Sequence, residues 1–219
     1  MSVPVPADPP NWELTLSVST AEQTHALGAA LGTSLEAGDL LVLSGELGAG
    51  KTTFTQGLGE GLGVRPGIIS PTFVLVRIHP NLPDGARPGG PDLVHVDAYR
   101  LGSASEIDDI DLENTMDSSV TVVEWGRGRV EHLSESRLEV DLHRATGLQP
   151  PVRTTKTRGT DDTGSGAPEV DTLGSGTLDS GTLDFDTLDD DEPRTIVMRG
   201  FGPRWDRSPA LAGIPEGTA

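Results

Sequence analysis

The chain has 219 residues, which is enough for one α/β domain of ordinary size with about 50 residues to spare. Its net charge of −18, without a basic patch, argues against direct nucleic-acid binding, because an acidic surface repels phosphates. The absence of cysteine excludes disulfides, thiolate catalysis and cysteine-based metal sites.

The first elements follow a Pro-rich start. Residues 1–10 predict a disordered tail and carry no signal-peptide pattern, and the chain has no long apolar run, so we expect a cytoplasmic protein without a membrane partner. Trp12 to Val18 alternates like a half-buried strand. Ser19-Thr20-Ala21-Glu22 matches a capping box, and the helix after it is expected to stop at Gly38. The apolar run Asp39 to Leu43 is typical of a buried parallel strand.

A second helix is expected from Lys51, although glycines at positions 57, 59 and 61 each cost about 1 kcal/mol relative to alanine. That helix therefore needs tertiary support. An acidic helix is predicted at 105–116, and further strands are predicted at 72–78, 93–97, 120–124, 137–142 and 194–198.

The domain organisation follows from composition. We expect a core over residues 11–145, a disordered acidic insert over 146–192, the final strand of the core over 193–201 and a flexible tail over 202–219. The insert holds four copies of a five-residue repeat that begins Thr-Leu, a period that matches neither helix nor strand. Calcium binding by this repeat is the alternative, but the nine-residue glycine and aspartate pattern of calcium ladders is missing.

The segment from Gly45 to Thr52 satisfies the P-loop pattern, with an apolar strand before it and a helix after it. Its glycines let backbone N–H groups surround phosphates, and the helix N-terminus favours negative charge. We expect Lys51 to bridge the β- and γ-phosphates and the Thr52 hydroxyl to bind magnesium. The backbone of the run Gly48, Ala49, Gly50, Lys51, Thr52 and Thr53 would hold the phosphate oxygens.

Magnesium also needs a carboxylate, and two acids end predicted strands where α/β sheets bind ligands. Asp97 and Glu124 fit equally well on this ground, one for the metal and one for the attacking water, and each could instead only cap a turn. The hydroxyls of Ser70-Pro71-Thr72-Phe73 could sense the γ-phosphate, although such a sequence is more often a simple turn.

These motifs in this order resemble the TsaE family, also called YjeE. The resemblance spans about residues 12–145 and includes Leu47 to Phe54 and Ser70 to Val76. His95-Val96-Asp97-Ala98-Tyr99-Arg100-Leu101 and Val122-Val123-Glu124-Trp125-Gly126 complete it, and these motifs together are more specific than the P-loop alone.

The resemblance implies an α/β fold with a P-loop NTPase-like, mostly parallel sheet flanked by helices and with antiparallel C-terminal strands. It implies ATP on the P-loop, magnesium on Thr52 and Glu124, and catalytic roles for Lys51, Asp97 and Glu124. It also places Thr20 and Arg194 near the nucleotide.

The family resemblance further implies an ATPase that supports N6-threonylcarbamoyladenosine formation on tRNA. Such a protein binds a TsaB–TsaD pair and meets tRNA only through that complex. A P-loop small-molecule kinase is the first alternative, but the region between the P-loop and Asp97 offers only Arg65, Arg77 and Arg87 for a lid. No Asn-Lys-x-Asp segment is present to support a GTPase, whereas a nucleotide-gated binding module with negligible turnover stays open.

Deletion of residues 160–191 is expected to leave the melting temperature nearly unchanged. Residues 161–192 hold eleven acidic and no basic residues, a composition that cannot bury enough apolar surface to offset its ordering entropy. Thermal unfolding of the deleted and full-length chains tests this, and a large drop would show that the insert packs on the core.

Overall fold

A computed structural model describes residues 9–101, 103, 106–107, 110, 112–144 and 192–211. Most of the residues predicted to be disordered or flexible, 1–10, 146–192 and 202–219, lie outside this set. The described part of the predicted tail, residues 202–211, contains a 3₁₀ turn and the buried Trp205. Across the described part of the chain, no helix is both long and apolar enough to cross a membrane.

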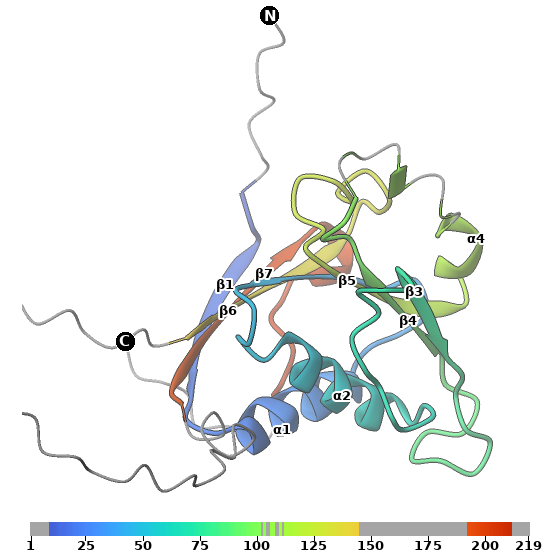
Figure 1. Cartoon of the computed structure of the whole chain (residues 1–219), viewed down its shortest axis with the longest axis horizontal. Helices are drawn as coiled ribbons and strands as arrows, with labels where there is room; N and C mark the ends of the chain where they lie inside the picture. Colours follow the sequence, from blue (N-terminus) through green and yellow to red (C-terminus); the bar gives the residue numbers. More distant parts are fainter. Residues whose placement is uncertain are drawn as a thin grey trace, which may run out of the picture. The chain divides into compact units, whose positions relative to one another are not determined.

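One seven-stranded sheet with helices on its faces forms the structure, in the strand order β1-β7-β6-β2-β5-β4-β3 (Figure 1). The elements are β1 (Trp12–Val18), α1 (Ala21–Gly32), β2 (Leu40–Gly45), α2 (Lys51–Leu62), β3 (Val76–His79), β4 (Asp92–Asp97), α4 (Glu113–Met116), β5 (Ser119–Glu124), β6 (Arg137–Arg144), β7 (Arg194–Phe201) and the 3₁₀ turn η2 (Pro203–Trp205).

The expectation of a mostly parallel sheet is corrected by the strand pairing. β6-β2, β2-β5 and β5-β4 are parallel, whereas β1-β7, β7-β6 and β4-β3 are antiparallel, so the sheet is evenly mixed. The parallel block is central because its strands are buried on both faces, as the apolar run of β5 indicates. The antiparallel strands lie on the two sides of this block, with β7 and β1 beyond β6 and β3 beyond β4.

The parallel block determines where polar side chains gather. β5 pairs with β2 and β4 in a register that sets Leu43 and Asp97 opposite Glu124. The carboxyl ends of these three strands therefore meet at one edge, where β2 leads through Gly45 into the N-terminus of α2.

Helices α1 and α2 pack backbone to backbone on one face of the sheet (Figure 1). A Cβ added to Gly57 would lie 2.0 Å from the carbonyl oxygen of His25, and one added to Gly61 would lie 2.2 Å from that of Ala29. Gly28 of α1 makes the same kind of close approach to the carbonyl oxygen of Phe54. These contacts supply the tertiary support that the glycine-rich sequence of α2 requires.

Two predicted boundaries of α1 shift. Thr20 is the N-cap and accepts from the backbone N–H of Gln23, whose side chain accepts from the N–H of Ser19. The capping partner is therefore Gln23 rather than Glu22. The helix ends at Gly32 with Thr33 as its C-cap, before the predicted stop at Gly38.

The strand predicted to begin at residue 72 begins at Val76. Residues 72–74 form a turn, in which the backbone N–H groups of Val74 and Leu75 both donate to the carbonyl of Pro71. Leu75 has a φ of 67°, which no extended strand allows. Within the region predicted as one acidic helix, the described helix α4 covers only residues 113–116.

Gly57→Ala is expected to lower the free energy of unfolding by about 1–3 kcal/mol, because the new Cβ overpacks the α1–α2 contact. The loss should appear despite a gain of about 1 kcal/mol in helix propensity. Denaturant unfolding measures it, with Glu60→Ala as a matched control on the exposed side of α2, where a change within about 0.5 kcal/mol is expected. Equal stability of Gly57→Ala and wild type would contradict the packing account.

Candidate functional site

A hollow of about 310 Å³ lies at the edge where β2, β4 and β5 end. It is lined by the glycine-rich loop, the start of α2, the 70–72 turn and both strand-end acids, through Leu47, Gly48, Gly50, Lys51, Thr52, Thr53, Ser70, Thr72, Asp97, Glu124 and Trp125. Segments from four separate parts of the chain therefore meet at one place.

A larger hollow of about 410 Å³ lies elsewhere, beside the C-terminal half of α2 and the 82–86 loop. It contains neither the glycine-rich loop nor the strand-end acids. The concentration of reactive groups therefore makes the smaller hollow the candidate functional site.

The loop between β2 and α2 has a conformation that requires glycine. Gly45, Gly48 and Gly50 have φ values of 149°, 80° and 98°, a range that favours glycine over residues with a side chain. Gly50 caps α2 in the left-handed conformation, and its carbonyl accepts from Phe54. The first N–H groups of α2 have no earlier turn to bond to, so they and the helix dipole favour an anion here.

Lys51 lies on the first turn of α2 with its side chain folded back over the loop. Its Nζ donates to the carbonyl oxygens of Gly45 and Glu46, each at 3.0 Å, and lies 4.5 Å from the ring centroid of Trp125. Burial lowers the pKa of Lys51, and the negative charges of Glu124 and Asp97 oppose that shift. The ammonium thus lies between the loop and the two acids.

Asp97, at the end of β4, is buried and held by three donors. Its Oδ2 accepts from the Thr72 hydroxyl at 2.5 Å and from the Ser70 hydroxyl at 3.5 Å. Its Oδ1 accepts from the backbone N–H of Tyr99 at 2.9 Å. The Ser-Pro-Thr turn is therefore coupled to the β4 acid through hydrogen bonds that a phosphate or metal ligand could exchange.

Glu124, at the end of β5, is 3% exposed and pairs with the fully buried His95 of β4. His95 Nε2 lies 2.9 Å from Glu124 Oε1. Because an ionised carboxylate only accepts, Nε2 carries the proton and His95 orients Glu124 by donating to it. In the described part of the chain, the buried Nδ1 of His95 finds no hydrogen-bond partner.

Two strained residues flank the site. Leu75 and Trp125 are the non-glycine residues with positive φ among those described, at 67° and 62°. The carbonyl of Leu75 accepts from the N–H of Asp97, and Trp125 directly follows Glu124. Strain of this kind persists where the surrounding contacts impose it, and it concentrates at functional sites.

The structure brings together most of the predicted site residues. Gly48, Gly50, Lys51, Thr52, Thr53, Asp97 and Glu124 line the hollow, as do Ser70 and Thr72 of the predicted switch segment. Ala49 is part of the loop but packs into the core with no exposed surface.

Two further predicted residues lie behind the loop. Arg194 reaches Gly50, where an added Cβ would lie 3.6 Å from its Nε, yet it does not line the hollow. Thr20 does not line it either and acts as the N-cap of α1. Thr24, one turn after Thr20, contacts the position of Gly50 instead.

Three other residues at or beside the site were not predicted individually from the sequence. Arg144 lies beside the loop, with its Nη1 3.2 Å from a Cβ added to Gly48, and no local pattern marks it. His95 and Trp125 were named only inside family motifs. Their contacts with Glu124 and Lys51 depend on strand register, which the sequence alone does not reveal.

The donor set suits magnesium held jointly with a phosphate. No group of three or more His, Asp or Glu that could hold a metal occurs among the residues described by the structure. Mg²⁺ characteristically uses one or two carboxylates together with phosphate oxygens and water. Thr52 and Glu124 in a hollow with a glycine-rich loop match that preference.

Comparison with known proteins identifies a matching family. The family model described as "Threonylcarbamoyl adenosine biosynthesis protein TsaE" matches residues 18–151. The tRNA threonylcarbamoyladenosine biosynthesis protein TsaE of Streptomyces coelicolor is 59% identical over 122 residues, which cover 55% of this chain and 79% of that protein. Its namesake from Mycobacterium tuberculosis is 46% identical over 146 residues, 64% of this chain and 84% of that protein.

A solved structure is similar along most of the chain. The crystal structure of Bacillus subtilis YdiB matches with a TM-score of 0.54 and 25% identity, and the match covers 89% of this chain and 90% of that one. The TsaE of the same species is 39% identical over 125 residues, 57% of this chain and 73% of that protein.

His95→Leu is expected to lower the free energy of unfolding by about 1–3 kcal/mol, because it leaves a buried carboxylate without its donor. In Glu124→Leu the pair is already broken, so adding His95→Leu should cost less than it does in wild type. Denaturant unfolding of the two single variants and the double variant gives the coupling energy. Exposed His143→Leu is the control, and a coupling energy near zero would contradict the pair.

Proposed function

The chain belongs to the TsaE family of threonylcarbamoyl adenosine biosynthesis proteins, and on that premise we propose that it is a magnesium-dependent ATPase. In this proposal it supports N6-threonylcarbamoyladenosine modification of tRNA together with a TsaB–TsaD transferase complex in the cytoplasm. The fold is that of a P-loop nucleotide hydrolase, with β2, the glycine-rich loop and α2 as the phosphate-binding unit.

One observation carries the proposal. Lys51, Thr52, Asp97 and Glu124 line a single hollow at the N-terminus of α2. A cation, a hydroxyl and two carboxylates around a ring of backbone N–H groups form the donor set that a nucleoside triphosphate with magnesium requires.

Each residue then has a distinct role. Lys51 would exchange the carbonyls of Gly45 and Glu46 for the phosphates, and the loop N–H groups would hold the phosphate oxygens. Thr52 and Glu124 would hold the magnesium ion, and Asp97 would orient the attacking water. Magnesium, when bound, neutralises charge that develops on the phosphate oxygens.

The 70–72 turn links occupancy of the site to the surface. Ser70 and Thr72 donate to Asp97, so a change in what Asp97 binds alters the turn that presents Phe73. Phe73 is 89% exposed, and Leu47, which lines the hollow, is 90% exposed. Exposed apolar side chains around a site are a surface that partner proteins cover. The strongly acidic chain is expected to meet tRNA only through that partner.

Steady-state ATP hydrolysis by the purified protein, alone and with TsaB–TsaD from the same organism, tests this proposal. We expect stimulation by the pair and complete loss of ATP binding in Lys51→Ala, which should still fold because the ammonium that it removes contacts two loop carbonyls and the Trp125 ring rather than the apolar core. Unchanged ATP affinity in a folded Lys51→Ala protein would overturn the site assignment. Tight ATP binding without stimulated turnover would favour a kinase or a nucleotide-gated binding module.

Glu124→Ala is expected to reduce ATP hydrolysis far more than ATP binding. The metal that Glu124 would hold stabilises charge that grows in the transition state, so its loss acts mainly on kcat. Calorimetric ATP binding and steady-state kinetics on the same preparation separate the two effects. An equal loss of both would make Glu124 a binding residue only.

A further inference from the structure

Arg129, in the loop after β5, bonds to both strand ends that carry the site acids. Its Nη1 donates to the carbonyl oxygen of Ala98 at 2.7 Å and lies 3.4 Å from that of Trp125. Ala98 directly follows Asp97, and Trp125 directly follows Glu124. One guanidinium thus connects the residues that come immediately after the two acids.

We propose that Arg129 is a positioning residue, which fixes Asp97 and Glu124 relative to each other and to Lys51. This proposal rests on the function proposed above, because the acids must share one metal-phosphate centre. Arg129 does not line the hollow, so it acts through the backbone it holds.

The contacts of Arg129 begin where the β4–β5 ladder ends. Asp97 and Glu124 form the last pair in register, and the N–H of Ala98 donates to the carbonyl of Glu124 at 2.9 Å. Beyond this point the segments after β4 and β5 continue as separate loops. The guanidinium bonds to both segments there, and so prevents the two strand ends from separating under the repulsion of two buried carboxylates.

Arg129 also restrains the strained Trp125. The φ of 62° at Trp125 is uncommon for a bulky residue, so external contacts must hold it. Its N–H donates to the carbonyl of Leu43, and its own carbonyl faces Arg129. This conformation sets the indole ring 4.5 Å from Lys51 Nζ and 5.4 Å from the ring of Tyr99. Through Trp125, Arg129 therefore reaches the third charged group of the site.

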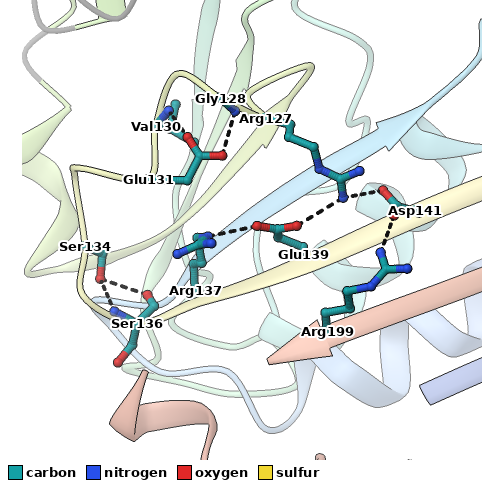
Figure 2. A network of polar contacts seen from close by, with 10 residues as sticks. All are labelled: Arg127, Gly128, Val130, Glu131, Ser134, Ser136, Arg137, Glu139, Asp141 and Arg199. Atoms are coloured by element: carbon teal, nitrogen blue, oxygen red, sulfur yellow. Dashed lines mark hydrogen bonds and ion pairs between the residues drawn. The ribbon is translucent and has the colours of Figure 1, made fainter. Parts of the chain in front are cut away.

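The loop that carries Arg129 is itself held in place by contacts with the rest of the protein. The N–H of Arg129 donates to the carbonyl of Gly126, and the next residue, Val130, is fully buried. On the other side of the loop, Arg127 forms ion pairs with Glu139 at 3.1 Å and Asp141 at 2.6 Å (Figure 2). The loop is anchored to β6 by one arginine and to the site backbone by another.

This pair of arginines provides a matched comparison. Arg127→Met removes two ion pairs from the same loop, but Arg137 and Arg199 still partner Glu139 and Asp141. Arg129→Met removes instead the bonds to Ala98 and Trp125. Both variants lose one positive charge and keep an unbranched side chain, but only Arg129→Met breaks the contact with the site backbone.

For ATP hydrolysis, we expect Arg129→Met to lower kcat about 10-fold or more, because small misplacements of catalytic groups are costly. The Mg²⁺ concentration for half-maximal rate should rise in parallel, while KM for ATP stays within about threefold. Arg127→Met should keep kcat within about threefold, and Arg129→Lys should recover part of the loss because it retains one donor. Equal kcat losses in the two methionine variants would overturn the proposal.

Amide hydrogen exchange gives a readout that needs no activity. The N–H of Tyr99 donates to Asp97, so its exchange reports the position of that acid, and the N–H of Trp125 reports the β5 end. Arg129→Met should speed exchange at both amides at least about 10-fold, and Arg127→Met should not.

Unchanged exchange in Arg129→Met, or faster exchange with an unchanged kcat and Mg²⁺ dependence, would overturn the positioning role. Failure of the proposed function would look different. It would show as a wild-type protein that neither binds nor hydrolyses ATP, whatever the exchange rates of the variants.

Discussion

The parallel pairing of β5 with β2 and β4 is the constraint on which the candidate site depends. In parallel strands the carboxyl ends coincide, so the glycine-rich loop after β2 and the acids that end β4 and β5 meet without any special contact between them. The mixed sheet does not weaken this arrangement, because its antiparallel pairs lie on either side of the block. Strand order thus places the groups, and local contacts refine their positions.

The charged groups that meet there are each paired or hydrogen-bonded before any ligand binds. Lys51, Asp97 and Glu124 are each less than 10% exposed, and buried charges are unfavourable unless they are paired and hydrogen-bonded. Lys51 has two carbonyls and an indole face, Asp97 has three donors, and Glu124 has His95. The carbonyls and hydroxyls are exchangeable partners, so an anion and a divalent cation can replace them with small rearrangement.

Sequence reasoning found the parts of the site that local pattern encodes. The motif from Gly45 to Thr52 and the acids at positions 97 and 124 could be read from spacing, and the TsaE family prediction is confirmed. Contacts that depend on register could not be predicted, since the His95–Glu124 pair and the bond of Arg129 to Ala98 join residues about 30 positions apart. The even mix of strand directions was missed for the same reason. The end of α1 at Gly32 and the start of β3 at Val76 differ from the predicted boundaries by a few residues, because sequence patterns place the ends of elements less precisely than their centres.

The described ends of the β6–β7 connection lie next to each other, beside the glycine-rich loop. β6 ends at Arg144 and β7 begins at Arg194, directly opposite in antiparallel register. Next to them, Arg144 Nε pairs with Glu192 Oε2 at 2.5 Å, which ties together the two described ends of the connection. The entropy of closing a loop grows only with the logarithm of its length, so the cost of a longer connection is small once its ends are joined. Both arginines lie against the glycine-rich loop, at Gly48 and Gly50, so the same closure that accommodates the insertion also keeps two cations beside the candidate phosphate site.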